Sequence, residues 1–257
     1  MHASKTGQES RPSLLLQAAE LPRAWGEYAA LVGSAGLLAL APKGDGGPVV
    51  VLPGFTGTDG STMVLRKFLG RVGHRPVAWG LGRNIGPSRK ILDGIDDLVQ
   101  RLADEHQQPV QLVGWSLGGI YARHVAVRHP HLVRRVITLG SPYRLLDHHN
   151  SHAAWVYDLY APLHDAADDL SPGGPTSRPL GVPTTSIYSR TDGVVPWWSC
   201  TEEESDLAEN VGVFSSHNGL GHNPQAMYVV ADRLALPARD LPRFHPAPVW
   251  RAFFLGA

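Results

Sequence analysis

The stretch LVGWSLGG, residues 112–119, decides the fold of this chain. Ser116 stands between Gly114 and Gly118, after the apolar run PVQLV and before LGGIYARHVAVRHP, which reads as a helix. A serine between glycines at a strand-to-helix turn is held in a strained conformation that only small neighbours permit, with its hydroxyl at the end of the sheet. A serine that merely caps the helix is the alternative, but the strand–turn–helix context favours a nucleophile.

Strands and helices alternate on both sides of this turn. Apolar runs that predict buried strands cover residues 48–55, 75–80, 109–114, 133–140, 182–189 and 210–216. Helical spacing covers residues 61–73, 88–106, 117–130 and 224–236. This alternation predicts an α/β fold, with a predominantly parallel, doubly wound sheet and helices on both faces.

Two segments depart from the alternation. Residues 1–12 read as a loose tail and residues 13–40 as two short helices with a break near Pro22, which together form an N-terminal helical extension over 1–40. Residues 141–182 contain aromatics, histidines and prolines without a strand pattern, so we expect a lid-like insertion, the cap, over the carboxyl edge of the sheet. The chain of 257 residues is expected to form one domain, 1–257.

Composition narrows the class of partner. Lys plus Arg and Asp plus Glu both total 23, so the formal net charge is zero and nothing indicates a nucleic-acid partner. The apolar residues 29–42 are too short to span a bilayer, although they leave peripheral contact with lipid open. The first residues lack the basic-then-apolar order of a signal peptide, so we expect a cytoplasmic protein.

A serine nucleophile needs a base, and the base needs an orienting acid, which on this kind of fold follow later in the chain in the order acid, then histidine. Asp192, in SIYSRTDGVVP, directly follows a predicted strand, although TDG is also ordinary turn chemistry. Asp206 is the weaker rival, in an acidic stretch. VFSSHNGLGHNP offers His217 directly after the last predicted strand and His222 beside the start of the final helix. We favour Asp192 and His217.

Two backbone N–H groups are candidates for an oxyanion hole, which stabilises the negative oxygen of an acyl-transfer intermediate. Leu117 begins the helix after the serine, and Phe55 follows the first strand in VLPGFTGTDG. VLPGFTGTDG is also consistent with a plain glycine-rich loop. It matches neither of the nucleotide-binding motifs, G-x-G-x-x-G and the Walker sequence.

Together, GWSLGG, PVVVLPGF, SIYSRTDGVVP and SHNGL resemble the α/β-hydrolase superfamily, specifically its small bacterial lipase/esterase branch. The resemblance covers roughly residues 48–140 and 183–236. It implies an acyl-enzyme mechanism with Ser116, His217 and Asp192 as the triad. One departure is Pro53-Gly54 at the oxyanion turn, where most relatives have His-Gly.

The resulting hypothesis is a serine hydrolase that cleaves a small-molecule or lipid carboxylic ester. An acyltransferase or thioesterase would use the same residues, and a non-catalytic binding module on the same fold is the alternative from another class. Four aromatic residues are expected to line the substrate pocket, namely Trp115, Trp155, Tyr157 and Trp197. Asp147 with His148, His149 and His152 could bind a metal, but we expect an exposed polar segment, with no metal and no cofactor.

Overall fold

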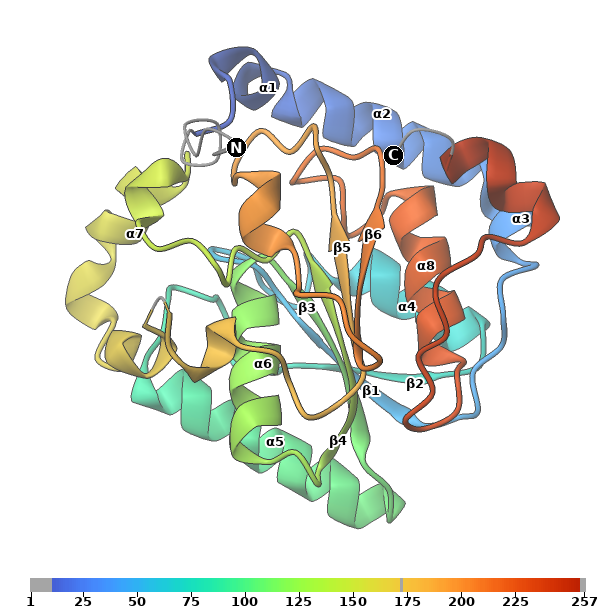
Figure 1. The fold of residues 1–257 in the computed structure, drawn as a ribbon. Helices are drawn as coiled ribbons and strands as arrows, with labels where there is room; N and C mark the ends of the chain where they lie inside the picture. Colours follow the sequence, from blue (N-terminus) through green and yellow to red (C-terminus); the bar gives the residue numbers. More distant parts are fainter. Residues whose placement is uncertain (1–10, 172, 255–257) are drawn as a thin grey trace, which may run out of the picture.

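A six-stranded, wholly parallel sheet forms the centre of the molecule, in the order β2-β1-β3-β4-β5-β6 (Figure 1). The computed structural model describes residues 11–171 and 173–254, so most of the expected N-terminal tail lies outside the described residues. The strands are β1 (Pro48–Leu52), β2 (Arg75–Ala78), β3 (Val110–Trp115), β4 (Val133–Leu139), β5 (Thr184–Tyr188) and β6 (Ala208–Gly212). The predicted parallel, doubly wound α/β sheet is confirmed.

Each face of the sheet has its own hydrophobic core, because successive strand residues point to opposite faces. In β1, Val49 and Val51 belong to one core and Val50 and Leu52 to the other, and all four are almost fully buried. The first core is covered by α4 (Met63–Arg71) and α8 (Pro224–Leu234), and the second by α5 (Arg89–His106) and α6 (Leu117–Arg128). Burial on both faces explains why the strands are continuously apolar.

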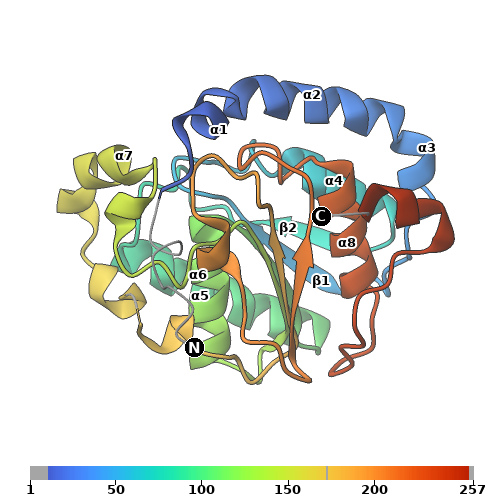
Figure 2. The same cartoon turned by 45° about the horizontal axis from the view of Figure 1, so that its top comes forward.

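The cap follows β4 and contains α7 (Ala154–Leu159) with the short 3-10 helices η2 (His148–Asn150), η3 (Ala161–Leu163), η4 (Ala167–Leu170) and η5 (Pro175–Ser177). The N-terminal segment forms α1 (Leu14–Ala18), α2 (Glu20–Gly33) and α3 (Ala35–Leu38). Figure 2 shows α2 crossing above the edge of the sheet, with α7 beside the start of the N-terminal segment. The cap contacts that segment directly, since His152 Nε2 lies 2.9 Å from the Pro12 carbonyl oxygen.

The predicted break near Pro22 is wrong. The helices separate at Ala19, and α2 runs through Pro22. Proline is tolerated in the first turn of a helix, where its missing N–H would have no partner within the helix. Within the described residues, no helix is both long and apolar enough to cross a membrane.

Candidate active site

Ser116 occupies the turn between β3 and α6 in a strained backbone conformation, with φ 52° and ψ −121°. Its N–H donates to the Leu139 carbonyl of the neighbouring strand at 2.8 Å. Both flanking residues must be glycine, because backbone atoms of neighbouring segments approach them closely. A Cβ on Gly114 would lie 2.3 Å from the Gly118 oxygen, and one on Gly118 would lie 2.4 Å from the Leu52 oxygen. The serine is therefore held by backbone on both sides, as the sequence predicts.

The structure brings His217 and Asp192 to this serine. His217 Nε2 lies 3.1 Å from Ser116 Oγ, and its Nδ1 lies 2.6 Å from Asp192 Oδ2. The other carboxylate oxygen of Asp192 accepts from the N–H groups of Val194 and Val195, both at 2.8 Å. Asp192 is 3 % exposed and His217 is 6 % exposed. The three side chains thus form a continuous hydrogen-bonded chain, in which Asp192 and His217 are buried and Ser116 is half-buried.

The electrostatics of this chain favour a basic imidazole. Burial lowers the pKa of His217 by desolvating its cation, but the charge of Asp192, the hydrogen bond to it and the charge of Glu20 outweigh burial. The net effect raises the pKa of His217 above its ordinary value. A raised pKa with Nδ1 held by a carboxylate leaves Nε2 oriented to take a proton from Ser116.

The two rival residues lie elsewhere. His222 Nε2 contacts the Ala24 carbonyl oxygen at 2.9 Å, and its ring packs edge-on against Tyr28. His222 therefore helps to attach α2 to the domain. Asp206 is exposed in the turn before β6.

The Leu117 amide directly follows the serine, and the Phe55 amide lies in the loop after β1. Leu117 is the first residue of α6, and Gly54 lies against the serine turn, since a Cβ on Gly54 would be 3.2 Å from Ser116 Cβ. Within residues 11–171 and 173–254, neither amide donates to a protein oxygen. Both N–H groups thus remain candidate donors to an anionic oxygen at Ser116.

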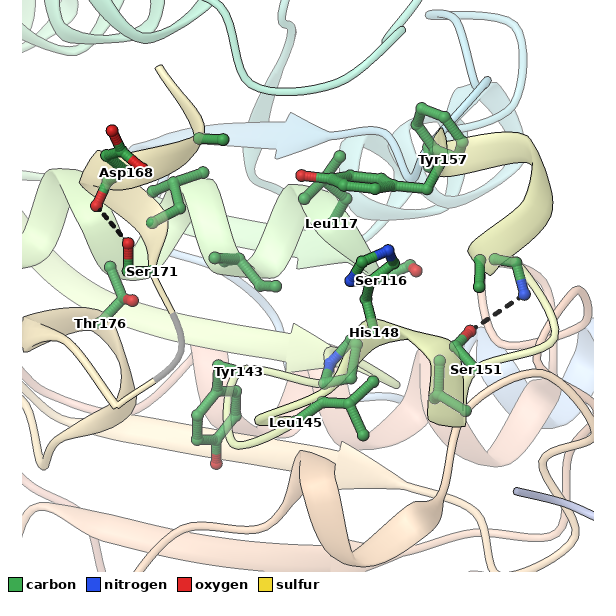
Figure 3. A pocket seen from close by; sticks show the side chains of 18 residues that line it. Ser116, Leu117, Tyr143, Leu145, His148, Ser151, Tyr157, Asp168, Ser171 and Thr176 are labelled. Atoms are coloured by element: carbon green, nitrogen blue, oxygen red, sulfur yellow. Dashed lines mark hydrogen bonds between the residues drawn. The ribbon is translucent and has the colours of Figure 1, made fainter. Parts of the chain in front are cut away.

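A cavity of about 380 Å³ extends from Ser116 between α6 and the cap (Figure 3). Its volume is within the range of small-molecule sites. Its walls are mainly apolar and come from α6, from the cap and from the loops after β1 and β5. The main apolar lining residues are Phe55, Leu117, Ile120, Tyr143, Leu145, Ala154, Tyr157, Leu170 and Val195. The cap thus closes one side of the serine site.

Of the four aromatics expected in the pocket, only Tyr157 lines this cavity. Trp115 turns away from it, donating from Nε1 to the His217 carbonyl at 3.1 Å and packing on the Gly221 backbone. Trp155 is 70 % exposed on the outer face of α7, and Trp197 stacks on Tyr188. A position next to the nucleophile or on the cap does not fix the side of the backbone from which a side chain projects.

Asp147, His148 and His149 are exposed, and one potential ligand atom of each lies within 4.8 Å of the others. His148 Nε2 already pairs with Asp158 at 2.7 Å, whereas His152 contacts the N-terminal segment instead. A cation here would compete with the His148–Asp158 pair. The group lies beside the cavity, which His148 also lines.

Sequence reasoning missed Glu20, a buried carboxylate in α2 that accepts from the backbone N–H groups of Gly193 and His217. A glutamate at the start of a mainly apolar helix gives no signal of such a role. It also missed most of the cavity wall. Ile120, one helical turn after Ser116, is a wall residue that helical spacing could have found.

Comparisons with known proteins bear on the fold of the chain. A sequence model described as the alpha/beta hydrolase fold matches residues 80–177. The pimeloyl-[acyl-carrier protein] methyl ester esterase of Aromatoleum aromaticum is 40 % identical over 67 residues, which are 26 % of this chain and 25 % of that protein. The chain thus aligns with only about a quarter of the length of this curated relative.

Among solved structures, lipase B of Aspergillus fumigatus superposes with a TM-score of 0.56 at 17 % identity, over 75 % of this chain and 53 % of that one. The mature form of a Bacillus licheniformis lipase gives 0.56 at 18 % identity, over 77 % and 95 %. At these identities the likeness shows the fold, and the predicted superfamily resemblance is confirmed at that level.

Proposed function

Starting from a chain of the α/β-hydrolase fold, we propose that this protein is a serine hydrolase that cleaves carboxylic esters through an acyl-enzyme intermediate. The observation that carries the proposal is the buried His217, with Nε2 3.1 Å from Ser116 Oγ and Nδ1 2.6 Å from Asp192. A binding module has no need of a base aligned between a strained serine and a buried carboxylate.

In the proposed reaction, Ser116 Oγ attacks the ester carbonyl carbon while its proton passes to His217 Nε2. The negative carbonyl oxygen accepts hydrogen bonds from the N–H groups of Phe55 and Leu117. The intermediate collapses when its bond to the alkoxy oxygen breaks and His217 protonates the leaving alcohol. Water, deprotonated by the same nitrogen, then attacks the acyl-serine, and the acid leaves as the bond to Ser116 Oγ breaks and His217 returns the proton to that oxygen. Asp192 stabilises the imidazolium in both halves.

The cavity supports an apolar acyl group as the substrate class. Its walls beside Ser116 are aliphatic and aromatic, so transfer of an acyl chain from water into them is favourable at about 0.8 kcal/mol per CH₂ group. The curated relative is named as a methyl ester esterase, which fits a carboxylic ester. We therefore expect esters of apolar acids with small alcohols, drawn from small molecules or dispersed lipid.

A fluorophosphonate probe followed by intact-mass measurement tests the nucleophile. One adduct is expected on the wild type and none on Ser116→Ala. Ser141→Ala is the matched control, because Ser141 is a fully buried serine at the end of β4 that should leave labelling intact. Hydrolysis of p-nitrophenyl esters from acetate to palmitate then measures the acyl preference.

Absence of both the adduct and turnover would refute the hydrolase proposal in favour of a binding module. If Ser116 is labelled but the enzyme transfers the acyl group to an added alcohol rather than to water, the protein is an acyltransferase rather than a hydrolase. Faster cleavage of thioesters than of matched oxygen esters would replace the proposal with a thioesterase.

A further inference from the structure

Helix α2 has its polar side against the domain and its apolar side toward solvent, the reverse of an ordinary surface helix. Leu21, Trp25, Tyr28 and Val32 follow one another at helical spacing and are 45–74 % exposed. The charged residues of α2 are Glu20, Arg23 and Glu27, and all three bind loops at the carboxyl edge of the sheet. The inward face of the helix is thus fixed by polar contacts rather than by an apolar stripe.

Glu20 links the two loops that carry Asp192 and His217. We call residues 189–196, after β5, the acid loop, and residues 213–223, after β6, the base loop. Glu20 Oε1 accepts from the N–H of Gly193 at 2.8 Å and from the N–H of His217 at 2.9 Å. Oε2 accepts from the N–H and side-chain amide of Asn218 at 3.0 and 3.1 Å. A single carboxylate, 3 % exposed, thus joins both loops.

Both loops have a glycine where the N-terminal segment approaches. A Cβ on Gly193 would lie 2.4 Å from the Leu16 backbone oxygen. A Cβ on Gly219 would lie 1.9 Å from Glu27 Oε2. A larger residue at position 193 would force α1 away, and one at position 219 would displace the Glu27 carboxylate, so the two loops are shaped to receive the N-terminal segment.

We propose that Glu20 is a positioning residue that holds the acid loop and the base loop in register, and so aligns His217 between Asp192 and Ser116. The peptide N–H groups of Gly193 and His217 share one oxygen atom, so neither loop can shift without lengthening one of these bonds. The catalytic consequence rests on the proposed function, whereas the alignment itself does not. In the proposed ester hydrolysis, Glu20 touches no reacting atom and acts through His217.

Glu20 also contributes charge. Three charged side chains of α2 lie near the Asp192–His217 pair. Glu20 is negative, Glu27 binds the start of the base loop, and Arg23 binds the acid loop. The charge of Glu20 adds to that of Asp192 in raising the pKa of His217. Neutralising Glu20 should therefore change the titration of His217, which a purely structural contact would not do.

The test compares Glu20→Gln with Glu27→Gln and Glu20→Asp. Glu27 is the matched control, since it lies two turns along the same helix and accepts a backbone N–H from the base loop at 2.6 Å. The pKa of His217 is measured by NMR on histidine labelled at Cε1, with its resonance assigned from its absence in His217→Ala. The pH dependence of kcat/KM is measured in parallel.

Glu20→Gln is expected to lower the pKa of His217, because it removes a nearby negative charge. Its kcat/KM at the plateau should fall roughly 10- to 100-fold through misalignment. Glu20→Asp keeps the charge but is shorter by one CH₂ group, so kcat should fall while the pKa stays near that of the wild type. Glu27→Gln should leave the pKa unchanged.

An unchanged His217 pKa and an unchanged kcat/KM in folded Glu20→Gln would overturn the proposal. If Glu20→Gln fails to fold, Glu20→Asp provides the test. A wild-type kcat in Glu20→Asp would overturn the proposal. The NMR titration does not require turnover. A pKa shift in a protein without esterase activity would therefore refute the proposed function while the Glu20–His217 coupling stands.

Discussion

Replacing Asp192 by asparagine should abolish most of the activity while leaving the fold in place. The side-chain oxygen of the new residue can still accept from the N–H groups of Val194 and Val195, which now bind Asp192 Oδ1 at 2.8 Å. Its amide nitrogen then replaces the oxygen that lies 2.6 Å from His217 Nδ1. Because an amide donates, Nδ1 must become the acceptor and Nε2 must carry the proton. The imidazole then presents the wrong tautomer to Ser116.

The magnitude follows from this tautomer change. A base that cannot accept the serine proton, at a site with its other contacts retained, should lose about 10³–10⁴ in kcat/KM. This factor corresponds to about 4–5.5 kcal/mol of transition-state stabilisation. The free energy of unfolding should change far less, by about 1–2 kcal/mol, because one buried hydrogen bond to a charged group is weakened while the loop contacts persist.

The assay is hydrolysis of p-nitrophenyl butyrate near pH 8, with urea unfolding as the stability measurement. Asp206→Asn is the matched control, because Asp206 is exposed in the turn before β6 and should retain full activity. More than a tenth of wild-type kcat/KM in a well-folded Asp192→Asn would refute the assignment of the acid. Loss of activity in Asp206→Asn instead would transfer that role to Asp206.

Four further results are expected. His217→Ala should be inactive and His222→Ala active, and the opposite pattern would reverse the choice of base. kcat/KM should rise with pH through a midpoint above about 6.5, since the raised pKa of His217 keeps it protonated, and unable to accept, until higher pH; a flat profile from pH 5 to 9 would contradict this. Gly118→Ala should lower the free energy of unfolding, measured in urea, by roughly 1–3 kcal/mol, because its Cβ would lie 2.4 Å from the Leu52 oxygen. Ala154→Trp should fill the cavity and favour butyrate over decanoate esters by about 10-fold or more, and an unchanged acyl preference would place the acyl chain elsewhere.

The sheet could be predicted from the sequence because its strands are buried on both faces and its helices are amphipathic. The least accurate strand was β6, which spans Ala208–Gly212 rather than residues 210–216. In this strand Glu209 is buried. Its charge is balanced by Arg233 at 3.1 Å, and Thr185 donates a hydrogen bond to its carboxylate at 2.9 Å. An apolar pattern cannot reveal a strand residue whose burial depends on partners about 24 positions away.

The serine, acid and base could be selected because each follows a strand, and the carboxyl ends of parallel strands meet at one edge. The walls of the cavity could not be selected in this way. Whether an aromatic residue on the cap enters the cavity depends on how the cap docks. In α7, Tyr157 faces the Phe55 ring at a centroid distance of 5.5 Å, whereas Trp155 two residues earlier points to solvent.

The orientation of α2 has a physical reason that no local pattern contains. The acid loop and the base loop leave strand ends, so their N–H groups lack sheet partners and need acceptors once they are buried. A helix that covers them must turn its carboxylates inward, and Glu20 and Glu27 meet this requirement. The apolar side of α2 then faces outward because the polar side is bound to the two loops. The N-terminal extension therefore contacts the loops of the candidate site, since without Glu20 the amides of Gly193 and His217 would lose their shared acceptor.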